Sequence, residues 1–294
     1  MKKVLWVLQN IKGTLDFYDE LNLMMLVASV CSWRNHHHSY NELHVDSLTR
    51  DMLDQLNVLH LWDNVVTEIV DAKAPINLES FWASSKVKVL KAQTQPVTIV
   101  DNDLFTYDNL LQYDDLAPVI YSHDEDGKQW YFNASDRYVG KIKSIPTEII
   151  YTPNRTALNV CYLSFTNFKL QQQYADWSYK VMVELSELGA PKGAHMTYAE
   201  QKLLKQIIIH QQIEYKTLIS NIYQCGKYKF HPEEHNNRGV WDYSESKSKY
   251  WHVGFEKKQL RNSDTKKDFL YRIVAKYIPK NEMKSRIENL LSFI

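Results

Sequence analysis

Two acidic residues follow an apolar run in the stretch TIVDNDLF, residues 98–105. Asp101 and Asp103 are separated by one residue, so a bend of the chain there lets both side chains turn toward one point. Carboxylate oxygens are hard ligands that suit Mg²⁺ or Mn²⁺, and such an ion keeps part of its coordination shell for substrate phosphates. The spacing therefore predicts a metal site for a diphosphate-bearing substrate. The alternative is a solvated turn formed by Asn102 and Asp103.

A histidine, a glycine and two lysines lie close together in YWHVGFEKKQL, residues 250–260. Histidine is a common metal ligand, which makes His252 a candidate. Gly254 allows the backbone to approach a bulky group, and Lys257 or Lys258 can place a point charge against a phosphate. A site for a metal and a diphosphate needs these three properties together. The alternative is an ordinary strand end with exposed lysines.

The two motifs together resemble those of the GT-A glycosyltransferases, and most closely the glycogenin/galactosyltransferase-like group with its relatives in bacterial glycan synthesis. That group has the pattern H-x-x-G-x-x-K-P-W near its end, whereas this chain has H-x-G-x-x-K-K, without the Pro-Trp. The resemblance implies that Asp101, Asp103 and His252 bind Mn²⁺ or Mg²⁺. It also implies that Gly254 and Lys257 contact the diphosphate of the donor.

Two further positions match the expected donor site of this family. Lys86, in FWASSKVKVL (81–90), falls at the edge of an apolar helical face, from which it can reach into a cleft. The alternative for Lys86 is a side chain that lies over apolar surface with its charge in water. Asn159, in LNVCYLSF, stands where relatives have an Asn-Ala-Gly turn. The resemblance implies that Lys86 and Asn159 contact the donor.

The segment YAEQKLL, residues 198–204, resembles the D-Q-D-x-L-N element of the same family, with Lys202 in place of its second acid. Glu200 falls on an apolar helical face and requires a partner there, because an unpaired buried charge is costly. The resemblance implies that Glu200 and Gln201 are catalytic, with the Gln201 amide oxygen beside the reacting sugar. It also implies that the donor keeps its anomeric configuration during transfer.

The resemblance implies a metal-dependent glycosyltransferase that moves a sugar from a nucleotide sugar, with a UDP-sugar as the expected donor, to a glycan acceptor. Hydroxymethylated phage DNA is a second acceptor to consider, because residues 245–294 contain 12 Lys and Arg against 6 Asp and Glu. Two other functions stay open. One is a nucleotide-sugar-binding protein without catalysis, and the other is a nucleotidyltransferase, which also uses carboxylate-bound Mg²⁺ on an α/β sheet.

Strands and helices alternate in the first hundred residues, which positions the aspartates. The strands are predicted at 4–8, 42–47, 64–70 and 96–101, and the helices between them at 21–32, 47–59 and 77–93. This order predicts an α/β fold of the GT-A (Rossmann-like) type with a mostly parallel central sheet, whose ligands bind beyond the carboxyl ends of the strands. Later elements are a strand at 156–165 and helices at 168–186, 197–223 and 279–293, which predict a helical C-terminal part.

Length and composition set the remaining expectations. With 294 residues, the chain is expected to form a catalytic domain at 1–245 and a C-terminal segment at 246–294. A formal net charge of zero provides no whole-chain field toward nucleic acid or anionic lipid. Three scattered cysteines fit a reducing compartment, and no apolar stretch has the length of a signal peptide or a membrane span. We therefore expect a cytoplasmic protein without a membrane span.

Aromatic residues are abundant, with 8 Trp and 19 Tyr. Aromatic rings stack on sugars, so Trp130, Tyr131, Trp241 and Tyr243 are candidates for an acceptor platform. The alternative is that these rings serve packing.

Overall fold

The structure is a computed structural model that describes residues 1–14, 19–126, 134–154, 156–218, 250–253, 257 and 264–292. Its strands are β1 (Lys3–Leu8), β2 (Tyr40–Val45), β3 (Asn64–Val66), β4 (Thr98–Val100), β5 (Leu104–Thr106), β6 (Val119–Asp126), β7 (Thr156–Phe165), β8 (Tyr215–Thr217) and β9 (Tyr250–His252). Its longer α-helices are α1 (Glu20–His36), α2 (Ser47–Gln55), α4 (Ser84–Ala92), α7 (Phe168–Glu187), α9 (Leu203–His210), α11 (Asp264–Val274) and α12 (Lys280–Leu291). Four short α-helices are α3 (Glu68–Asp71), α5 (Asp136–Val139), α6 (Thr147–Ile150) and α8 (Ala194–Thr197). Among these described helices, none combines the length and the apolar character needed to cross a membrane.

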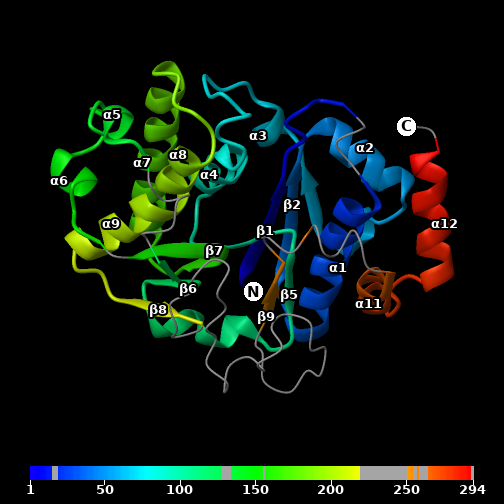
Figure 1. The fold of residues 1–294 in the computed structure, drawn as a ribbon. Coiled ribbons are helices and arrows are strands. Elements are labelled where there is room, and N and C mark those ends of the chain that lie inside the picture. Colours follow the sequence, from blue (N-terminus) through cyan, green and yellow to red (C-terminus); the bar gives the residue numbers. More distant parts are fainter. Residues whose placement is uncertain are drawn as a thin grey trace.

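A seven-stranded sheet in the order β3-β2-β1-β4-β7-β6-β8 forms the centre of the protein (Figure 1). Strand β7 runs antiparallel to both of its neighbours, β4 and β6, and the other neighbouring strands of this sheet are parallel. The predicted α/β class with a mostly parallel central sheet is therefore confirmed.

Strand β1 shows how this sheet supports a core on each face. Val4 and Trp6 belong to one apolar cluster, which includes residues of α1, α11 and α12. Leu5 and Val7 belong to another cluster, with residues of α4, α7 and α9, because successive side chains of a strand point to opposite faces. Figure 1 shows these two sets of helices on opposite sides of the sheet. The predicted helical C-terminal part is confirmed, and the predicted boundary after residue 245 lies outside the described residues and stays a prediction.

The predicted helix at 77–93 is shorter than expected, because α4 begins only at Ser84. Asn77 caps a separate turn that precedes α4. Its side-chain oxygen accepts hydrogen bonds from the backbone N–H groups of Glu79 and Ser80 at 3.0 and 3.3 Å. The segment between this turn and α4 is therefore not helical, and its side chains do not follow the helical pattern read from the sequence.

The predicted helix at 197–223 is wrong over residues 211–218, and its last five residues lie outside the described part of the chain. Helix α9 ends at His210, and Gln212 adopts a positive φ of 53°, which a helix cannot continue through. Strand β8 then adds to the edge of the sheet beside β6. The predicted strand at 64–70 is also divided, into β3 and the short helix α3.

Candidate functional site

A two-stranded antiparallel ribbon brings the two sequence motifs together. Strand β5 begins directly after Asp103, and its first residue, Leu104, lies opposite His252 of β9. The backbone N–H of Val253 also donates a hydrogen bond to the carbonyl oxygen of Asp103 at 3.1 Å. Residues that are far apart in the sequence therefore meet at the end of β4.

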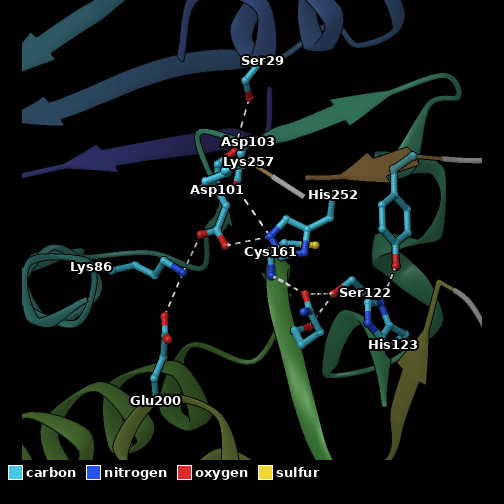
Figure 2. Close-up of polar contacts among 12 residues, drawn as sticks. Ser29, Lys86, Asp101, Asp103, Ser122, His123, Cys161, Glu200, His252 and Lys257 are labelled. Atoms are coloured by element: carbon cyan, nitrogen blue, oxygen red, sulfur yellow. Dashed lines mark hydrogen bonds and ion pairs between the residues drawn. The ribbon is translucent and has the colours of Figure 1, made fainter. Parts of the chain in front are cut away.

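The side chains of Asp101, Asp103 and His252 point into one space (Figure 2). One ligand atom of each lies within 4.8 Å of the ligand atoms of the other two. His252 Nε2 is 3.4 Å from Asp103 Oδ1 and 3.9 Å from Asp101 Oδ2. Two carboxylates and one imidazole fit a divalent cation, and the majority of hard oxygen ligands favours Mn²⁺ or Mg²⁺.

Two lysines bind the other oxygen of each aspartate. Lys86 Nζ is 2.6 Å from Asp101 Oδ1, and Lys257 Nζ is 2.8 Å from Asp103 Oδ2. Each aspartate thus turns one oxygen toward His252 and the other toward a lysine. A cation between the three inward atoms can be bound without displacing either lysine, and the lysines fix the orientation of the carboxylates.

The charged groups of this cluster shift the pKa values of Asp103 and His252. Burial alone would raise the pKa of Asp103, but Lys257 and His252 outweigh it and hold the pKa well below its usual range. Burial would lower the pKa of His252, but the Cys161 sulfur and the Asp103 carboxylate raise it well above its usual value. Both pKa shifts favour a protonated imidazole beside an ionised Asp103 in the cation-free protein. Binding of a cation at His252 would release this proton.

Lys86 connects the aspartates to a second element. Its Nζ is 2.8 Å from Glu200 Oε1, and both side chains are largely buried, with 12% and 7% of their surface exposed. Burial would lower the pKa of Lys86, but Asp101 and Glu200 raise it, so the ammonium group stays charged. Burial raises the pKa of Glu200, and the nearby Lys86 offsets this only in part. The buried carboxylate at Glu200 thus has the partner that its apolar helical face required.

Glu200 and Gln201 lie in a π-helical turn, Tyr198–Lys202, between α8 and α9. The hydroxyls of Tyr174 and Ser178 on α7 donate hydrogen bonds of 2.7 Å each to carbonyl oxygens of this turn. These bonds hold the turn, and single π turns inside helices occur frequently at functional sites. The side-chain oxygen of Gln201 is buried and has no hydrogen-bond partner in the part of the chain that the structure describes.

Asn159 lies on β7 and its amide is fixed by three hydrogen bonds. Its Oδ1 accepts from the Cys161 backbone N–H at 3.0 Å and from the Ser122 hydroxyl at 2.9 Å. Its Nδ2 donates to Glu125 Oε1 at 2.6 Å. Glu125 is a buried carboxylate that the sequence analysis missed, since an acid in a strand is usually exposed and no motif marks it.

All predicted site residues that the structure describes line one cavity of about 530 Å³. They are Lys86, Asp101, Asp103, Asn159, Glu200, Gln201, His252 and Lys257. The cavity lies at the carboxyl ends of β1 and β4, where the predicted parallel sheet places ligands, and its volume is within the usual range for a small-molecule site. Gly254 and Lys258 lie outside the described residues, as do Trp130, Tyr131, Trp241 and Tyr243.

The profile of DUF6734, a family of unknown function, matches residues 5–284. The chain belongs to this family. The match spans both the aspartate motif and the histidine motif, so both are part of the DUF6734 region. Among proteins with curated functions, none matches this DUF6734 chain.

Several solved structures align with much of this DUF6734 chain. The apo form of mouse xyloside xylosyltransferase 1 is 12% identical, with 87% of this chain and 98% of that chain covered and a TM-score of 0.44. PaToxG glycosyltransferase is 10% identical over 71% of this chain and 69% of that one, with a TM-score of 0.42. The galactosyltransferase LgtC, in complex with donor and acceptor sugar analogues, is 14% identical over 67% and 69%, with a TM-score of 0.38.

Proposed function

We propose that this DUF6734 protein is a metal-dependent glycosyltransferase that moves a sugar from a nucleotide-sugar donor to an acceptor hydroxyl. The supporting observation is the convergence of Asp101, Asp103 and His252 on one space in the cavity wall. Two neighbouring carboxylates occur at many surface turns. Their combination with an imidazole from the other end of the chain and with two lysines is what a metal–diphosphate site requires.

Asp101, Asp103 and His252 would hold the expected cofactor, Mn²⁺ or Mg²⁺. When bound, the cation stabilises the charge that develops on the departing diphosphate. Lys257 is 42% exposed at its side chain, so it is accessible to a phosphate group as well as to Asp103. Lys86 is enclosed by two carboxylates and is better placed to fix the sugar end of the site than to bind a free phosphate. A UDP-sugar is the expected donor.

Transfer breaks the bond between the anomeric carbon and the phosphate oxygen and forms a bond from that carbon to the acceptor oxygen. The proton of the acceptor hydroxyl passes to the departing phosphate. Gln201 lines the cavity, and its side-chain oxygen is buried without a described partner, so a turn of the amide toward the cavity would place the negative end of its dipole beside the cationic sugar. Glu200 is already paired with Lys86, which supports an orienting role and transfer with retention of configuration.

A glycan is the acceptor that we propose. Several basic side chains of the described C-terminal helices already pair with acids of the same helices. Arg272 and Lys280 pair with Asp268, and Arg286 pairs with Glu282. Three basic residues share two acids here, so these pairs offset part of the positive charge that a phosphate backbone could meet. Modified DNA stays a prediction, and a steep salt dependence of acceptor binding would support it instead.

The test is incubation of the protein with a panel of nucleotide sugars and Mn²⁺, followed by measurement of released nucleoside diphosphate. The wild type should release it, and Asp103→Asn should not. Asp176→Asn is a matched control, because Asp176 pairs with two lysines on the surface, away from the cavity.

Two outcomes would overturn this proposal. Release of pyrophosphate from a nucleoside triphosphate and a sugar 1-phosphate would indicate a nucleotidyltransferase. Binding of a nucleotide sugar without release of any product would indicate a non-catalytic binding protein.

A further inference from the structure

Trp82 is an exposed aromatic side chain in the wall of the cavity. It is 44% exposed, whereas the preceding residue, Phe81, is fully buried. In the helix predicted over 77–93, Trp82 would lie on the same apolar face as Phe81. The structure differs because α4 begins only at Ser84, so Trp82 lies in the turn before the helix and faces outward.

The exposure of the cavity wall changes along this element. Lys86 lies four residues after Trp82, and its side chain is only 12% exposed because Asp101 and Glu200 enclose it (Figure 2). Gln201, next to Glu200, also lines the cavity. The buried end of this wall is thus charged and polar, and the end at Trp82 is apolar and open to solvent.

We propose that Trp82 is a stacking platform for a pyranose ring of a glycan acceptor. This inference rests on the proposed glycosyltransferase function and specifies its acceptor class. One face of a pyranose presents mainly C–H groups, which pack well against the negatively polarised face of an indole. The hydroxyls at the edge of the same ring stay free to reach the polar groups further inside.

The position of Trp82 favours the acceptor over the donor as its occupant. The diphosphate of a donor is directed to the cation that Asp101 and Asp103 would hold, and to Lys257 beside it. A ring that covers Trp82 enters from the solvent side, as an acceptor must after the donor is in place. Covering the indole also removes apolar surface from water, which stabilises the bound acceptor.

The experiment is a glycan array probed with the protein in the presence of Mn²⁺ and UDP, which occupies the donor position. The wild type should bind a defined set of saccharides. Trp82→Ala should weaken binding to the same saccharides about tenfold, as expected for loss of one aromatic contact and its buried area. Trp82→Phe should retain most of the binding, because it keeps a ring. Tyr151→Ala is the matched control, since Tyr151 is 60% exposed and does not belong to the cavity wall.

Release of nucleotide from the donor, without acceptor, is measured for the same variants. Trp82→Ala should reduce glycan binding far more than this release. A wild type that binds no glycan, or a Trp82→Ala variant that binds glycans as the wild type does, overturns the platform. If Trp82→Ala instead loses affinity for UDP alone by calorimetry, Trp82 contacts the nucleobase and the inference is wrong.

The results that contradict the proposed function differ from those that contradict the stacking platform at Trp82. A wild type that releases nucleotide but binds no saccharide contradicts only the platform. A wild type that binds saccharides through Trp82 but releases no nucleotide from any donor contradicts the transferase and leaves a carbohydrate-binding surface.

Discussion

Two buried lysines, Lys86 and Lys205, form similar ion pairs in different surroundings. Lys205 Nζ is 2.9 Å from Asp124 Oδ1 and 2.8 Å from the Tyr121 hydroxyl. The same ammonium group lies 4.1 Å from the centroid of the Tyr215 ring, which is a favourable cation–π distance. This cluster pairs one cation with one carboxylate, and none of its residues belongs to the cavity wall.

Lys86 is instead shared by two carboxylates, Asp101 and Glu200, beside the cavity. One ammonium group does not neutralise both of them, so the site keeps a negative charge for a bound cation to offset once His252 has released its proton. A buried ion pair is therefore no sign of a functional site by itself. An ion pair that has surplus charge and lies at the wall of a cavity does indicate a functional site.

The largest expected effect is that of changing Asp103, one of the two carboxylates that face His252. Asp103→Asn removes the negative charge of one metal ligand and should lower Mn²⁺-dependent release of nucleotide by about three orders of magnitude, because the cation contributes several kcal/mol to the stabilisation of the leaving group. Calorimetry should show weaker Mn²⁺ binding, and circular dichroism should show an unchanged fold. A fully active Asp103→Asn protein would mean that the aspartates are only a turn.

Lys205→Met tests the balanced cluster. It leaves Asp124 without its cation and should lower the free energy of unfolding by about 3 kcal/mol, as breaking a buried ion pair does. Urea unfolding measures this loss. Release of nucleotide at a temperature where the variant is folded should stay near the wild-type rate. A specific loss of catalysis would place Lys205 in the site and remove the distinction between the two lysines.

Lys86→Met sharpens the same distinction through metal binding. Without Mn²⁺ it should destabilise the protein by about 3 kcal/mol, because the buried Glu200 and the partly exposed Asp101 lose their partner. With Mn²⁺ the loss should be smaller, since a bound cation compensates Asp101. Thermal unfolding with and without Mn²⁺ measures this difference, and Lys205→Met should show no such rescue. Equal Mn²⁺ effects on both variants would contradict the comparison.

Gln201→Ala is expected to have a moderate effect. Loss of one dipole beside the reacting sugar should slow transfer about tenfold without stopping it, which is less than the loss of a direct oxyanion donor. NMR of the product's anomeric proton, with an α-linked donor, should show retention. A β-linked product would identify Glu200 as a general base, and Glu200→Gln would then remove nearly all activity.

The smallest effect is the pH dependence that Glu200 imposes on stability. Burial raises the pKa of Glu200 above the ordinary value of 4.5, despite the nearby Lys86. The folded state therefore binds more protons than the unfolded state between pH 4.5 and the raised pKa of Glu200. The contribution of Glu200 to stability falls as the pH rises through that window. Glu200→Gln should remove this slope. Urea unfolding of both proteins in metal-free buffer, across that pH window, would show parallel profiles if the pKa of Glu200 were unshifted.

The parts of the site that depend on local chemistry could be predicted from the sequence. Asp101 and Asp103 follow a buried strand, and the residue types of His252 and Lys257 fit the same ion and phosphate. The sheet class followed from the alternation of strands and helices, since that order favours parallel pairing. These predictions needed no knowledge of how distant segments pack.

The parts that depend on tertiary structure could not be predicted in the same way. Glu125 is buried only because β6 pairs with β7 and the Asn159 amide meets its carboxylate. The exposure of Trp82 depends on where α4 begins, and helix ends are poorly determined by propensity. The π turn at Glu200 depends on hydroxyls of α7. For Glu125 and for the π turn, a partner distant in sequence decides the outcome.

The ribbon formed by β5 and β9 has a consequence for how the protein folds. His252 and Asp103 meet only after the ends of a very long loop have come together, and closure of long loops slows folding. The sheet around β1 and β4 includes contacts of much shorter sequence separation. During refolding, tryptophan fluorescence of the core should therefore recover before Mn²⁺-binding capacity does. The interval between the two signals would measure the time that the chain spends folded but without its cation site.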